Sequence, residues 1–150
     1  MADEQGESVD LEHLRGLAEL VLREEGYPSG AELTVLLVSD DEMSSYNERF
    51  LNRSGPTDVL AFPVEELVPG VTPDHDPTGP PLMIGDVIVA PAFVRRRAAD
   101  NEVSFDDEMA LMVAHGILHL LGYDHLDDED AELMERRETE LLSMVGRTRQ

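Results

Sequence analysis

The chain has 150 residues, 41% of them hydrophobic, and its formal net charge is -22 because 33 acidic side chains outnumber 11 arginines. The length predicts one domain, and the apolar content excludes a chain that is disordered throughout. The charge excludes a generally basic nucleic-acid-binding surface, and the absence of cysteine excludes disulfides, a cysteine nucleophile and a thiolate zinc finger.

The N-terminal residues, MADEQGESVD, are acidic and lack the apolar segment of a secretion signal. No stretch of the sequence approaches the roughly eighteen apolar residues that are needed to span a bilayer. We therefore expect a cytoplasmic protein with no membrane partner. Residues 1–9 and 146–150 are expected to be flexible ends of a single domain over residues 1–150.

The first half of the chain predicts two helices with a strand between them. Apolar residues spaced three to four apart predict an amphipathic helix from Asp10 to about Gly26. The nearly continuous apolar run at 32–39 is typical of a strand buried on both faces. Asp40 is then expected to cap a short helix that ends near Asn52.

Two further strands are predicted at 58–62 and 83–90, and the loop between them holds six of the nine prolines. Because the strands are adjacent in the chain, we expect them to pair antiparallel. Pro91 suits the first turn of a helix that runs to about Asn101.

A central helix is predicted from Ser104, its N-cap, to Leu121, and Gly122 should end it. Residues 109–121 read MALMVAHGILHLL, which is apolar on nearly all sides, so this helix should lie in the middle of the domain. The acidic stretch 127–140 is expected to cap and solvate a last amphipathic helix.

Three histidines follow the spacing HxxxHxxGxxH in the string HGILHLLGYDH. His115 and His119 are four residues apart on one helix face, and a bend at Gly122 would let His125 return to the same point. Three neutral ring nitrogens that leave a fourth coordination position for water are typical of catalytic zinc. Such ligands would also bind nickel or copper.

A lone histidine on an apolar helix is more often a satisfied core residue than a ligand. Burying two imidazoles on one face without a shared partner would be costly, so the three together predict metal binding. His13 and His75 do not belong to such a cluster of histidines, and we expect both to be solvated.

The same spacing occurs in metzincin proteases, but Gly116 stands where their motif places the general-base glutamate. A peptide bond needs a protonated leaving group, whereas the charge that develops on a phosphodiester can be met by a metal and an arginine. This favours phosphodiester hydrolysis, in which the metal's water is the catalytic group and no catalytic side chain is assigned. A metallopeptidase remains an alternative.

The string HGILHLLGYDH resembles the signature of the YbeY family of bacterial rRNA-maturation endoribonucleases. GPTDVLAFP at 55–63 resembles that family's PTDVLSFP segment, and residues 84–86 resemble its LGD strand. The resemblance implies an α+β fold: a single compact domain with a small mixed sheet and a zincin-like central metal-binding helix.

The resemblance also implies a function: zinc-dependent cleavage of single-stranded RNA in 16S rRNA 3′-end maturation and ribosome quality control. The cofactor would be one zinc ion per chain on His115, His119 and His125. The partners would be an rRNA precursor and the ribosome or its small subunit, and we do not expect DNA. A non-catalytic ribosome-assembly factor whose zinc only fixes the turn after the central helix is an alternative.

The chain departs from the family pattern at two positions. Many members carry an arginine, thought to face the scissile phosphate, where this chain has Leu51, and Arg49 or Arg53 could replace it from a neighbouring position. Ala61 replaces the family's serine.

Five further positions leave two interpretations open. Asp86 and Asp124 could hydrogen-bond the second ring nitrogens of ligand histidines, or could serve as structural caps. The only basic run, at 95–97, could contact RNA or the ribosome, or could form a solvated face.

Overall fold

The computed structural model describes residues 2–3, 8–52, 55, 57–64, 66–73, 76, 78–124, 126–147 and 149. The helices are α1 (Leu11–Glu24), α2 (Asp40–Leu51), α3 (Pro91–Asp100), α4 (Phe105–Leu120) and α5 (Asp128–Met144). The strands are β1 (Ala2–Asp3), β2 (Glu32–Leu37), β3 (Val59–Pro63) and β4 (Met83–Val89). Each predicted helix and strand is present within about two residues of its expected bounds, and β1 is additional.

The strands form one mixed sheet in the order β1-β2-β4-β3. β1, β2 and β4 run parallel. β3 pairs antiparallel with β4, as the sequence predicted, and Leu60 lies opposite Ile88. β3 is therefore an edge strand of the sheet. It directly follows residues 56–58, which read PTD, in the sequence.

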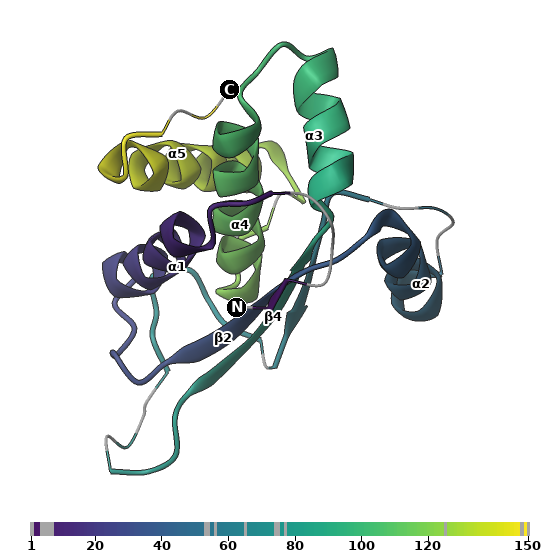
Figure 1. Ribbon diagram of the computed structural model, residues 1–150. Coiled ribbons are helices and arrows are strands. Elements are labelled where there is room, and N and C mark those ends of the chain that lie inside the picture. Colours follow the sequence, from purple (N-terminus) through teal and green to yellow (C-terminus); the bar gives the residue numbers. More distant parts are fainter. Residues whose placement is uncertain are drawn as a thin grey trace.

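The two faces of the sheet are covered unequally (Figure 1). α4 lies against one face, with α1 and α5 packed outside it and α3 beside it, whereas α2 lies on the other face. The larger apolar core joins α4 to α1, α5, β2 and β4, and a smaller cluster joins α2 to the opposite face. The chain thus forms a single α+β domain with α4 at its centre.

Side-chain caps mark the starts of the helices α4, α5 and α2. Ser104 accepts a hydrogen bond from the Asp107 backbone N–H, and Asp127 accepts one from Asp130 in the same way at α5, both as predicted. The predicted cap of α2 was wrong by one residue. Ser39 has the extended backbone of a cap and accepts from the Glu42 N–H, whereas Asp40 is already helical.

The loop after β3 folds back against the end of α4. Gly122 follows the helix with a φ of +101°, and a Cβ at this position would lie 2.0 Å from the carbonyl oxygen of Leu67. Glycine is needed there both for the left-handed backbone and for the close approach of the loop.

Within the described residues, no helix is long and apolar enough to cross a membrane.

Candidate metal centre

His115 and His119 lie on the same face of α4, as their spacing predicted, and their rings point at one another. The two Nε2 atoms are 3.1 Å apart, and the ring planes are nearly perpendicular, at 86°. Two imidazole nitrogens bound to one tetrahedral zinc at 2.0–2.1 Å would be about 3.3 Å apart. The observed separation is close to that value.

The other nitrogen of each ring faces a hydrogen-bond acceptor. His119 Nδ1 lies 3.0 Å from the backbone carbonyl oxygen of Tyr123, and His115 Nδ1 lies 3.5 Å from a carboxylate oxygen of Glu138. Since both partners accept, they favour the tautomer of each neutral ring that carries its hydrogen on Nδ1. The Nε2 atoms then meet with their lone pairs, an arrangement that a cation between them would stabilise.

The third predicted ligand, His125, lies outside the described residues, as does His75. Among the residues that the structure describes, no group of three His, Cys, Asp or Glu side chains could hold a metal ion. The described pair and its donor chemistry fit a divalent cation, and His125 follows the left-handed turn at Gly122 by three residues.

The histidine pair opens into a cleft of about 430 Å³ between α4 and β3. Val59 and Ala61 of β3 line it, and so does Arg97 of α3, whose guanidinium pairs with Asp58. Asp58 also accepts a hydrogen bond from the Val59 N–H at 2.7 Å, so it joins the start of β3 to α3. Partly buried cations and carboxylates therefore line the same cleft as the histidines.

Position 116 has no room for a side chain. A Cβ on Gly116 would lie 2.6 Å from Val87 and 3.2 Å from Val59. The helix approaches the sheet closely at this glycine, so a glutamate in the metzincin position would collide with β4. The packing of α4 on the sheet thus gives a structural reason for the missing peptidase base.

Known proteins match this chain over nearly its whole length. The family described as "Endoribonuclease YbeY" matches residues 1–146. This chain belongs to the YbeY endoribonuclease family. The resemblance predicted from the three sequence segments is thereby confirmed.

Individual members of the YbeY family show how close the relationship is. The relative from Acidothermus cellulolyticus, named Endoribonuclease YbeY, is 42% identical over 144 residues, which cover 95% of this chain and 88% of the relative. The Corynebacterium diphtheriae relative of the same name is 42% identical over 91% of this chain and 69% of its own length. A solution structure of a Thermotoga maritima protein superposes with a TM-score of 0.65 at 29% identity, covering 96% of this chain and 87% of that one.

Two predicted site residues do not reach the cleft. Asp86 was proposed to support a histidine, but β4 turns Val87 toward α4, and Asp86, one residue away, is exposed on the opposite face. Arg49 was a candidate for the missing YbeY arginine, but it is exposed on α2, with its guanidinium 5.5 Å from the Phe50 ring centroid. The second candidate, Arg53, lies outside the described residues.

The remaining predicted residues have mixed outcomes. Asp124 is exposed, and its support of a ligand histidine stays a prediction. His13 is not simply solvated, because it is half-buried and accepts a hydrogen bond from Arg147 at 3.2 Å.

In the basic run, Arg97 enters the cleft, whereas Arg96 pairs with Asp40 of α2 at 2.6 Å. Ala61, at the position of the YbeY serine, lines the cleft.

Sequence reasoning missed Glu138, which it placed in a solvated acidic stretch. Its side chain is only 2% exposed and lies 3.5 Å from His115 and 3.8 Å from Arg149. The signal was present in the spacing, because Met134, Glu138 and Leu141 follow the apolar stripe of α5.

A second missed group supports the turn after α4. The Tyr123 hydroxyl donates to Glu25, which also accepts from Arg137 at 2.7 Å. Burial, and then the hydrogen bond and negative charge of Glu25, raise the pKa of Tyr123 well above its ordinary value. These contacts hold the residue whose carbonyl faces His119.

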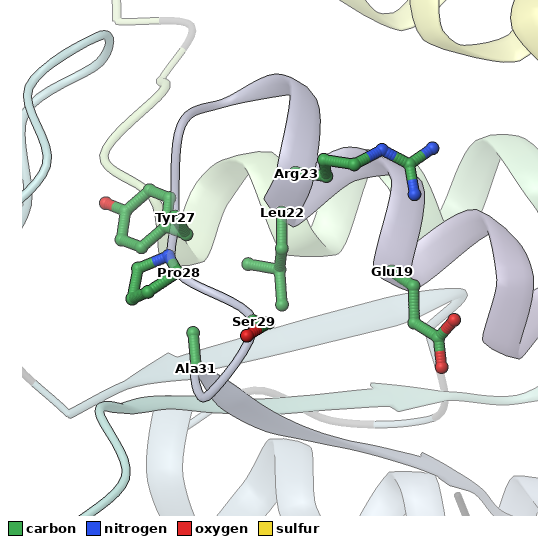
Figure 2. Close-up of a pocket in the computed structure, with 7 residues that line it drawn as sticks. All are labelled: Glu19, Leu22, Arg23, Tyr27, Pro28, Ser29 and Ala31. Atoms are coloured by element: carbon green, nitrogen blue, oxygen red, sulfur yellow. The ribbon is translucent and has the colours of Figure 1, made fainter. Parts of the chain in front are cut away.

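Another hollow, of about 350 Å³, lies where α1 leads into β2 (Figure 2). Its lining residues are Glu19, Leu22, Arg23, Tyr27, Pro28, Ser29 and Ala31. Figure 2 shows the charged ends of Glu19 and Arg23 on α1, away from the Tyr27 ring. Unlike the cleft, this lining brings no histidines together.

Proposed function

We propose that this chain is a zinc-dependent endoribonuclease that cleaves single-stranded RNA in 16S rRNA 3′-end maturation and ribosome quality control. The observation that carries the proposal is the pair of Nε2 atoms 3.1 Å apart, in a cleft that also contains Arg97. The relatives' shared name, Endoribonuclease YbeY, supports RNA as the substrate.

Residues 1–150 would act as one metal-dependent hydrolase domain in the cytoplasm, with an rRNA precursor and the small ribosomal subunit as partners. His115, His119 and His125 would hold one zinc ion per chain. When bound, zinc would supply Lewis acidity toward a phosphodiester. This role suits the neutral imidazoles that the acceptors at Nδ1 favour.

The arginines of the cleft would position the substrate. Arg97 is about one-third exposed, so its guanidinium can meet a phosphate oxygen while Asp58 holds its other edge. Arg149 lines the same cleft and lies 3.6 Å from Glu135. The net charge of -22 opposes RNA elsewhere on the surface, so binding would depend on this local site.

The assembly-factor alternative has one observation in its favour. Leu51 stands where many family members have an arginine, and Arg97 is already paired with Asp58 and lies 3.7 Å from Glu108. The metallopeptidase alternative is opposed by the packing around Gly116.

The proposal is tested by incubating the full chain, with and without zinc, with a single-stranded RNA, the matching DNA and casein. We expect the zinc-loaded chain to cleave the RNA but neither the DNA nor casein. Chelation of the zinc should abolish the cleavage of RNA. His119→Ala should lower cleavage more than about 100-fold, because even a lost supporting contact costs 10–100-fold at a metal site. His13→Ala, which changes a histidine outside the cleft, should cleave like the wild type.

Other results would contradict the proposal in different ways. Zinc binding without RNA cleavage would indicate the assembly factor, and cleavage of casein would indicate the peptidase. Full RNA cleavage by chelated protein or by His119→Ala would show that the histidines are not the reactive centre.

A further inference from the structure

Glu138 is a buried carboxylate on a helix whose other acids are solvated. Its side chain is 2% exposed and shares a face of α5 with Met134, Leu141 and Leu142 of the core. Burying a carboxylate is costly unless it is paired, and an apolar residue would suit this face better. The contacts of Glu138 must therefore account for its presence.

Those contacts lead to the metal centre. One carboxylate oxygen lies 3.5 Å from His115 Nδ1 and 3.8 Å from the Nε of Arg149. His115 comes from α4, Glu138 from α5 and Arg149 from the segment after α5, so the carboxylate joins three parts of the chain. Arg149 offsets the negative charge, while the carboxylate presents an acceptor oxygen to His115 Nδ1.

We propose that Glu138 is a positioning residue that holds the His115 ring with its hydrogen on Nδ1 and its Nε2 lone pair directed at His119. A carboxylate on the outer nitrogen also makes an imidazole a stronger ligand. The inference rests on the proposed function in one respect, because it assumes that the Nε2 atoms bind a metal.

Glu138→Gln is the informative variant, because its amide has nearly the same shape but can offer either an oxygen or an NH2 group to Nδ1. The matched control is Glu135→Gln. It removes the same charge from the same helix and from the same arginine, 3.6 Å away, but from a side chain that is 58% exposed. A difference between the variants therefore reports the contact with His115.

The first measurement is zinc affinity of the full chain, by competition with a chromophoric chelator. We expect Glu138→Gln to weaken zinc binding 10–100-fold, the usual effect of losing such a supporting partner, and Glu135→Gln to stay within about twofold of the wild type. Equal affinities for the two variants would overturn the proposal.

The second measurement needs no metal. Long-range ¹H–¹⁵N spectra of the zinc-free protein distinguish the two ring tautomers of His115. The wild type and Glu135→Gln should show the hydrogen on Nδ1, and Glu138→Gln should show both forms. An unchanged tautomer in Glu138→Gln would overturn the proposal even if its stability had fallen.

The two proposals fail in distinguishable ways. If the wild type binds zinc but cuts no RNA, the endoribonuclease proposal fails, while the comparison of the glutamine variants still decides the role of Glu138. If the wild type binds no zinc, the zinc-dependent endoribonuclease proposal is wrong, while the tautomer of His115 in the glutamine variants still decides the role of Glu138.

Discussion

The two faces of the sheet each carry a hollow, but the hollows differ in chemistry. On the α4 face, the cleft contains histidines, arginines and carboxylates. On the α2 face, a hollow of about 370 Å³ is lined mainly by apolar and aromatic side chains, including Tyr46, Phe50 and Phe62, with Asp86 beside them. Both hollows use β3, with Val59 and Ala61 in the cleft and Phe62 in the other hollow, because successive residues of a strand point to opposite faces.

The difference lies in how the polar atoms are held. On the α4 face, Glu138 is buried and the Tyr123 carbonyl is fixed by the turn, so each histidine has a partner that sets its orientation. On the α2 face, Asp86 is exposed and Phe50 is 56% exposed. A reactive site needs side chains whose rotamers are fixed by buried neighbours. Among the described residues, only the α4 face provides such side chains.

The largest effect should come from Gly122→Ala. A Cβ would lie 2.0 Å from the Leu67 carbonyl oxygen at a φ of +101°, so both collision and backbone strain oppose the native turn. We expect the free energy of unfolding to fall by about 3 kcal/mol or more, and zinc affinity to fall with it. Urea unfolding and a zinc titration would measure both.

The control for this variant is Gly55→Ala, beside α2. Gly55 has a similar φ of +82°, but a Cβ there would have no atom within 4 Å. It should lose only about 1–2 kcal/mol from strain and keep its zinc affinity. If both variants lost the same stability, the close approach of the loop to Gly122 would not matter.

A smaller effect should separate two neighbours on α3. Arg97 lies in the cleft, and Arg96 pairs with Asp40 on the α2 side. Arg97→Ala should raise the KM for RNA about tenfold or more, as expected for a lost hydrogen bond to a charged group, whereas Arg96→Ala should stay within about twofold. Steady-state cleavage kinetics measure the difference, and thermal unfolding checks that the variants fold. Equal KM values would remove Arg97 from the substrate site.

The elements that the sequence predicted are those with local causes. The caps Ser104 and Asp127 bond to backbone N–H groups three residues away, and the positive φ of Gly122 follows from a helix that ends there. The spacing of His115 and His119 likewise sets their common face within one helix. None of these features depends on a distant part of the chain.

The residues that were assigned wrongly depend on packing between distant elements. Asp86 was left open between supporting a histidine and capping, and the first interpretation is wrong because Val87 packs in the core with α4, so Asp86, the next residue along β4, faces the opposite side. Glu138 meets His115 only because α5 packs on α4. Similarly, Arg96 and Arg97 are neighbours on α3, and the way this helix packs on the domain decides which of them reaches the cleft.

The smallest effect is a pH dependence that should distinguish the tyrosines of the two faces. Because the folded-state pKa of Tyr123 is raised, the folded protein retains its hydroxyl proton above the unfolded pKa of about 10, where the unfolded chain loses it. Stability should therefore be unaffected by this group below pH 10. Above pH 10 it should decline, by at most about 1.4 kcal/mol per pH unit. In urea unfolding from pH 8 to 11, Tyr123→Phe should remove this decline and Tyr46→Phe, on the α2 face, should keep it. An identical slope in wild type and Tyr123→Phe would show that the contact with Glu25 does not hold the proton.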